Sequence, residues 1–180
     1  MSYQVLAAQS KKLSQKHHAN AKAEEDEAWE GSPFDWIRKE ASSTKGRIGR
    51  DLVTSLLESA GFNPARRGTA LEVNAKTIRV KTSLMWGAGD FKFEQFRDSN
   101  YDFVFCLGLH PDSAYGWFIP KEELIDEGSM QDRDGLTHQH GGQTGTEDFW
   151  LAVNASNVPA WLMPFGGTTD TVLKILQKSL

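Results

Sequence analysis

The stretch of sequence that decides the fold is Gly68 to Arg97, GTALEVNAKTIRVKTSLMWGAGDFKFEQFR. Apolar and polar residues alternate in it over residues 71–74 and again over residues 78–81. A period of two places successive side chains on opposite faces of a strand. The pattern predicts two adjacent strands joined by a short turn. Their buried face carries Leu71, Val73, Ile78 and Val80, and their polar face carries Glu72, Asn74, Arg79 and Lys81.

The segments around this stretch predict an α/β fold with a mixed sheet. An amphipathic helix is expected over residues 47–60, because apolar residues recur there at helical spacing. The nearly continuous apolar run over residues 101–109 is typical of a central strand. Further strands are expected over residues 115–119 and 149–153, and helices over residues 2–29, 34–40, 120–124 and 169–180. Residues 91–97 are expected to form a short helix or a strand. Polar loops are expected over residues 41–46 and over residues 128–145, and the second of these contains His138 and His140.

Composition predicts one globular domain. The chain has 180 residues, of which 39% are hydrophobic and 24% charged. We expect a helical extension over residues 1–31 and a single domain over residues 32–180. The one cysteine, Cys106, lies in the apolar run and predicts a buried thiol. Neither an apolar signal core nor a run of bilayer length is present, so we expect a cytoplasmic protein without a membrane partner.

Charge is distributed unevenly along the chain. Residues 46–97 hold nine basic and five acidic side chains, a net charge of +4, whereas residues 98–180 hold four and twelve, a net charge of −8. The positive charge therefore falls on the two predicted strands and their flanks, where a polyanion would bind. Solvated faces without a binding role are the alternative explanation for such a distribution.

A series of short motifs resembles a known group of nucleases. Lys45-Gly46-Arg47-Ile48-Gly49 opens a helix, Glu72 follows, and a strand ends in Val80-Lys81-Thr82-Ser83. This series looks like the core of a PD-(D/E)XK nuclease. The later segments Phe93-Glu94-Gln95-Phe96-Arg97, Tyr101-Asp102, Ile119-Pro120-Lys121 and Phe149-Trp150-Leu151 resemble small type II restriction-endonuclease-like proteins, over roughly residues 32 to 180.

The resemblance implies a role for several residues. Glu72 matches the acid that binds a divalent cation, Lys81 matches the lysine that faces the scissile phosphate, and Gln95 matches a polar residue on a following helix. The implied fold is an α/β restriction-endonuclease-like core, a mixed sheet flanked by helices. The implied activity is restriction-type hydrolysis of double-stranded DNA with Mg²⁺ or Mn²⁺ by a homodimer.

Two positions depart from the pattern that the resemblance implies. Arg79 stands where the second acid is expected, two residues before Lys81, and Arg50 stands where an acid is expected after Gly49. A guanidinium repels a metal ion. A carboxylate from elsewhere could replace the missing acids, and Glu94 is the first candidate, with Asp90, Asp51 and Glu58 as others.

Three functional hypotheses follow. The first is a metal-dependent endonuclease that uses Glu72, Lys81 and Gln95, with Glu72 and Glu94 as metal ligands. The second is a DNA-binding protein or inactive subunit on the same fold, which holds phosphate through Lys45, Arg47, Arg50 and Arg79. The third is an interaction protein that engages a partner through its N-terminal helix.

Overall fold

A six-stranded mixed sheet forms the centre of the fold. The computed structural model describes residues 2–17, 26–138 and 148–180. The sheet has the order β1-β2-β3-β5-β6-β11, and β3 and β5 run parallel while the other neighbours are antiparallel. Its strands are β1 (Ala65–Arg67), β2 (Ala70–Val73), β3 (Lys76–Leu84), β5 (Phe103–Leu109), β6 (Ala114–Pro120) and β11 (Gly166–Thr168). The predicted mixed sheet with a central strand at β5 is confirmed.

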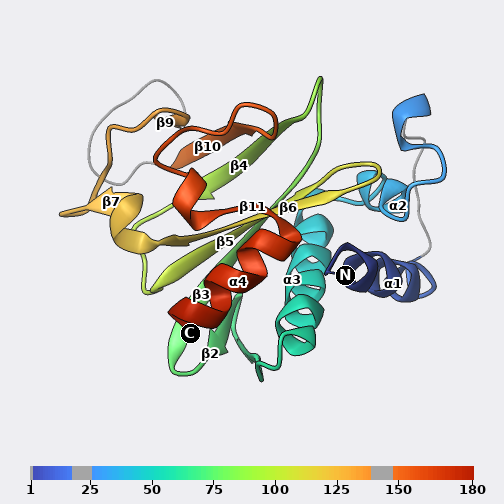
Figure 1. Cartoon of the computed structure of the whole chain (residues 1–180), viewed down its shortest axis with the longest axis horizontal. Helices are drawn as coiled ribbons and strands as arrows, with labels where there is room; N and C mark the ends of the chain where they lie inside the picture. The colour runs from blue at the N-terminus through green and yellow to red at the C-terminus, as the bar shows by residue number, and fades with distance from the viewer. Residues whose placement is uncertain (1, 18–25, 139–147) are drawn as a thin grey trace.

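Helices cover one face of this sheet (Figure 1). They are α1 (Ser2–Ser14), α3 (Ser42–Ser59) and α4 (Thr169–Ser179). Leu52 and Leu56 of α3 pack in one core with Ile78 of β3, Phe105 of β5 and Val172 of α4. The apolar stripe of α3 forms this layer because its residues recur every three to four positions. The predicted α/β class, with a mixed sheet flanked by helices, is confirmed.

A second, smaller sheet covers the opposite face. It has the order β4-β10-β9 and comprises β4 (Asp90–Phe96), β10 (Phe149–Asn154) and β9 (Leu136–His138). Phe91 and Phe93 of β4 and Leu151 of β10 pack there on Val104 and Trp117 of the central sheet. Residues 91–97, expected as a helix or a strand, thus form a strand up to Phe96. The resemblance implied that Gln95 lies on a helix. This expectation is wrong, because the alternating residues Phe91 and Phe93 bury one face of an extended segment.

The hairpin of β2 and β3 has the predicted arrangement. Asn74 and Ala75 connect the strands with φ angles of 50° and 63°, as a two-residue hairpin turn requires. Leu71 lies opposite Ile78, and both are fully buried on the helical side. Glu72 lies opposite Thr77 on the other side. The polar face of this hairpin therefore points away from the helices.

The N-terminal part differs from the sequence-based expectation. The first helix ends at Ser14 instead of Trp29, and a short 3-10 helix, η1, spans Glu27–Trp29. The expected loop over 41–46 is helical from Ser42 onward, because the Lys45 amide donates to the Ala41 carbonyl and closes a first turn. Leu6 and Leu13 of α1 are buried in the core with α3. The smaller elements are α2 (Asp35–Arg38), η2 (Lys121–Glu123), β7 (Ile125–Asp126), β8 (Ser129–Met130) and η3 (Met163–Phe165).

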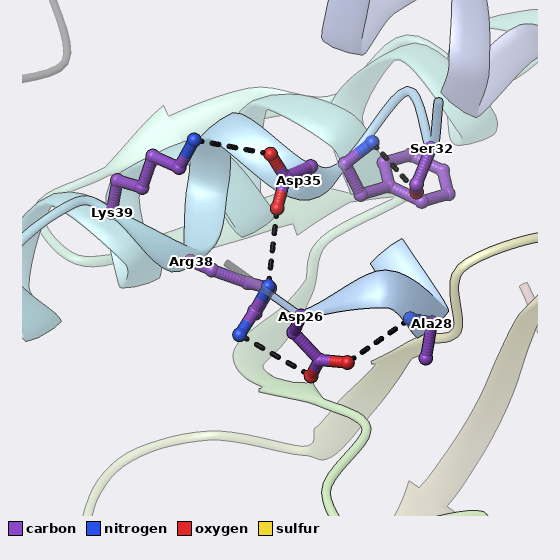
Figure 2. A network of polar contacts seen from close by, with 7 residues as sticks. Asp26, Ala28, Ser32, Asp35, Arg38 and Lys39 are labelled. Carbon is purple, nitrogen blue, oxygen red and sulfur yellow. Dashed lines mark hydrogen bonds and ion pairs between the residues drawn. The ribbon is translucent and has the colours of Figure 1, made fainter. Parts of the chain in front are cut away.

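A polar network joins η1 to α2 (Figure 2). Asp26 accepts a hydrogen bond from the Ala28 amide and lies 3.4 Å from the Arg38 guanidinium. Arg38 and Lys39 both pair with Asp35, at 3.2 Å each. The charges of this region thus neutralise one another within the chain. They leave little net charge here for a polyanion, in line with the zero net charge of residues 1–45.

Two sequence-based expectations concern particular segments. No helix in the described part of the chain is long and apolar enough to cross a membrane. In the polar loop expected over residues 128–145, β8 and β9 are short strands, and His140 lies outside the described residues.

Candidate functional site

A cavity of about 180 Å³ lies between β3, β4 and the start of β5. It is on the side of β3 away from the helices, since Thr82, which points the opposite way to Lys81, faces Gly49 of α3. Three cationic side chains line it, and none of the described residues in its lining carries a carboxylate. The lining residues are Arg79, Lys81, Gln95, Phe96, Arg97, Ser99, Tyr101 and Val104.

An irregularity in β4 positions the Lys81 side chain. The pairing of β4 with β10 shifts register where Glu94 and Gln95 face Trp150 alone, which is a β-bulge. Gln95 takes up a left-handed backbone conformation there, with φ of 61°. Its carbonyl accepts a hydrogen bond of 2.6 Å from Lys81 Nζ, and the Phe96 ring centroid lies 5.5 Å from the same nitrogen. Gln95, which the resemblance implies as a catalytic residue, contacts Lys81 through its backbone carbonyl, and its catalytic role stays a prediction.

The environment of Lys81 disfavours its charged form. Burial is the largest cause that lowers the pKa of the ammonium, and Arg79 and Arg97 lower it further through repulsion. Asp148 and the thiol of Cys106, which lies opposite Lys81 on the neighbouring strand β5, act in the opposite direction. A bound anion would relieve the repulsion and favour the ammonium, so the site is electrostatically suited to negative ligands.

The two arginines that replace expected acids converge on one residue. Arg50 Nη1 donates to the Thr69 carbonyl at 2.9 Å, and Arg79 Nη1 donates to the Thr69 hydroxyl. Burial lowers the pKa of Arg50, and the nearby Arg66 lowers it further. The edge of the sheet next to the β1–β2 turn is therefore cationic. Because a guanidinium presents several donors, each arginine keeps N–H groups beyond those that contact Thr69.

The predicted metal ligands are not brought together. Glu72 forms an ion pair of 2.7 Å with Arg67, and Glu94 forms one of 3.1 Å with Lys92. Glu72 lies opposite Thr77, four residues before Lys81 on β3, which corresponds to about 13 Å along the strand. The described residues contain no group of three or more His, Cys, Asp or Glu side chains that could hold a metal ion. The donor set therefore does not fit Mg²⁺, and the magnesium site stays a prediction.

The other candidate carboxylates lie outside the cavity lining. Asp51 pairs with Arg66, and Asp90 accepts a hydrogen bond of 2.8 Å from Asn154. Glu58, on α3, is exposed. None of these three residues lines the cavity with Lys81.

Lys45 and Arg47, predicted to contact DNA, lie in the first turns of α3. Burial lowers the pKa of Lys45 most, and Arg38 lowers it further while Glu40 raises it. Lys45 is thus coupled to the residues around α2, and Arg47 is exposed. Neither residue lines the cavity.

Four residues of this region were not among the predicted site residues. Arg97, Ser99 and Tyr101 line the cavity, and Asp148 binds Arg97 through an ion pair in which Arg97 Nη2 lies 2.6 Å from Oδ2. Arg97 ends both the positively charged stretch and the segment Phe93-Glu94-Gln95-Phe96-Arg97, and these were the signals in the sequence that pointed to it. Ser99 and Asp148 are brought in by loop geometry, for which the sequence offers no spacing rule.

No protein-family model matches this chain, and no curated protein and no solved structure matches it either. The PD-(D/E)XK resemblance therefore stays a prediction.

Proposed function

We propose that this protein binds double-stranded DNA by its phosphate groups and does not require a metal ion to do so. The observation that supports this proposal is that Arg79, Lys81 and Arg97 line one cavity, and no carboxylate is among the described residues of its wall. Lysine and arginine are the residues that neutralise DNA phosphates. The proposal follows the second of the sequence-based hypotheses.

Electrostatics restrict where DNA would approach. The cationic groups of the cavity and of the Thr69 edge belong to the segment 46–97 with net charge +4. Residues 98–180 carry a net charge of −8 and repel a polyanion. Binding of this kind releases condensed counterions and weakens steeply with added salt.

The same arrangement argues against metal-dependent cleavage. A divalent cation at Lys81 would meet three like charges, and Glu72 and Glu94 are held by Arg67 and Lys92. A single carboxylate does not supply the oxygen ligands that Mg²⁺ takes. Phosphate binding needs no such ligands, which is why we favour it over hydrolysis.

A gel assay tests the proposal. Purified protein is incubated with double-stranded DNA in Mg²⁺, in Mn²⁺ and in EDTA. We expect intact DNA in all three and a mobility shift that weakens with salt. Fragments that appear with a metal and vanish in EDTA would overturn the metal-independent function and favour the endonuclease. Absence of a shift at low salt would overturn DNA binding altogether.

Sedimentation of the same samples measures whether the predicted homodimer forms.

The first testable prediction concerns Arg79. Arg79→Gln should weaken DNA binding about fivefold to tenfold and reduce the slope of log affinity against log salt by about 1, because one phosphate contact is lost. Fluorescence anisotropy at several salt concentrations measures both. Arg133→Gln is the matched control, since Arg133 pairs with Glu123 and contacts Trp161 away from the cavity. Equal losses for the two variants would contradict the assignment.

A further inference from the structure

The positive charge of the side chains that line the cavity exceeds the negative charge of one DNA phosphodiester. Arg79, Lys81 and Arg97 contribute three positive charges, and Asp148 neutralises one through its ion pair with Arg97. The net charge of these four described side chains is +2. An internal phosphodiester carries a single negative charge, whereas a phosphomonoester carries about −1.5 to −2 at neutral pH. The charge of the cavity therefore matches a monoester.

Tyr101 supplies a second observation. The residue is 6% exposed, and its hydroxyl, shielded from solvent, has no hydrogen-bond partner in the described part of the chain. A buried hydroxyl without a partner is costly, so such groups usually mark a missing ligand or water. Burial raises the pKa of Tyr101 to about 12, so the phenol keeps its proton and can donate. The neighbouring Lys121 is held by Asp98 at 2.6 Å.

The size of the cavity limits what can enter. The volume of about 180 Å³ is well above what a single water molecule needs. A phosphate group fits such a space, but an internal diester offers only two free oxygens and is held between two nucleosides. A phosphate at the end of a strand has one ester link and three free oxygens, so it can enter while its nucleoside stays outside.

We infer that the cavity receives the terminal phosphomonoester of a DNA strand and so makes the protein prefer phosphorylated ends. The phosphate oxygens accept hydrogen bonds from Arg79, Lys81 and Tyr101, and Arg97 lies beside them. This inference rests on the proposed DNA binding and names the part of DNA that the cavity takes. A 5′ and a 3′ phosphate share this chemistry.

Four DNA probes of one sequence test the inference. They are a hydroxyl-ended duplex, the same duplex with 5′ phosphates, the same duplex with 3′ phosphates, and a closed circle that has no ends. Anisotropy and gel shift measure affinity at constant salt and in EDTA. We expect about tenfold tighter binding to one phosphorylated duplex than to the hydroxyl-ended one. The duplex that gains affinity identifies which end enters.

Variants of residues that line the cavity test whether the cavity causes the preference for phosphorylated ends. Tyr101→Phe removes one hydroxyl and should reduce the ratio of affinities for phosphorylated and hydroxyl-ended DNA about threefold or more. Arg79→Gln should reduce the ratio as well. Tyr115→Phe is the matched control, because Tyr115 packs on Phe91 and Trp117 and does not line the cavity.

The outcomes separate the two proposals. Equal affinity for all three duplexes, with salt-sensitive binding to the circle, would overturn the inference and leave DNA binding in place. Absence of binding to any probe would overturn DNA binding, and the inference with it. If both Tyr101→Phe and Arg79→Gln keep the full preference for phosphorylated ends, then another part of the protein causes that preference. This result would overturn the assignment of the preference to the cavity.

Discussion

Gly49 is the residue at which α3 lies closest to the sheet. A methyl group added there would overlap the Thr82 hydroxyl and lie 2.7 Å from the Thr82 Cβ. Real side chains do not approach so closely, so the helix or the strand would have to move. The glycine that forms part of the nuclease-like motif thus has a packing role of its own, independent of any catalysis.

Replacement of this glycine tests the packing. Gly49→Ala should lower the free energy of unfolding by about 1–3 kcal/mol, because it overpacks the contact between helix and strand. Gly46→Ala, in the same helix, has no atom within 4 Å of the new Cβ and should raise it by about 0.5–1 kcal/mol.

Urea denaturation of both variants measures these changes. Adding Thr82→Ala to Gly49→Ala should restore part of the loss, since it removes the overlapping atoms. If both glycine variants shift stability in the same direction, the close approach at Gly49 does not limit the fold.

The bulge in β4 links the second sheet to the cavity at the scale of an element. In a regular strand, residues three positions apart point to opposite faces. The extra residue of the bulge allows Phe93 and Phe96 to be buried together. The extra residue turns the Gln95 carbonyl toward Lys81. Stability of the second core and the position of the lysine therefore depend on the same backbone irregularity.

The effect of a substitution at Gln95 on stability should depend on how readily the new residue adopts a positive φ angle. Gln95→Val should lower the free energy of unfolding by about 1–3 kcal/mol, because a β-branched residue resists a φ of 61°. Gln95→Gly should be neutral or stabilising, since glycine adopts this conformation without strain. Glu94→Val, at the exposed neighbouring position, is the control and should stay within about 0.5 kcal/mol. Thermal denaturation followed by circular dichroism compares the three, and equal effects of valine and glycine would contradict strain at the bulge.

At the scale of the whole molecule, two cores lie on opposite faces of one sheet. The first packs α1, α3 and α4 on β3 and β5, and the second packs β4 and β10 on β5 and β6. β5 contributes to both, since Phe105 points to one core and Cys106 to the other. We therefore expect the described elements to unfold together. The N-terminal segment is part of this unit, because Ser2 donates to Asp170 at the start of α4.

Loss of packing in α1 should weaken the entire fold. Leu6→Ala should lower the free energy of unfolding by about 2–5 kcal/mol, because Leu6 is fully buried and its truncation leaves a cavity. Val5→Ala, at a partly buried position one residue earlier, should cost less than half as much. Thermal unfolding monitored by near-UV and far-UV circular dichroism tests this. If Leu6→Ala does not change the midpoint, α1 is a detachable arm and not part of the cooperative unit.

Local sequence rules determined much of the secondary structure. Alternation determined the polar and apolar faces of β2 and β3, and helical spacing determined the apolar face of α3. The apolar run over residues 101–109 predicted a buried central strand, which the structure has over Phe103–Leu109. These features could be predicted because each depends on side chains a few residues apart. The same rules found Arg79 and Lys81 on one polar face, since two residues along a strand point the same way.

Tertiary structure alone decided the rest. Residues 91–96 became a strand because β10 pairs with them. Glu72 is separated from Lys81 by the register of the hairpin, whereas Arg97, Ser99 and Tyr101 are brought to Lys81 from more than ten residues away. The sequence by itself determined which faces are apolar and where positive charge is concentrated, because both depend on neighbouring residues. Which charges meet in one cavity depends on strand order and register, and these are set by contacts between residues distant in the chain.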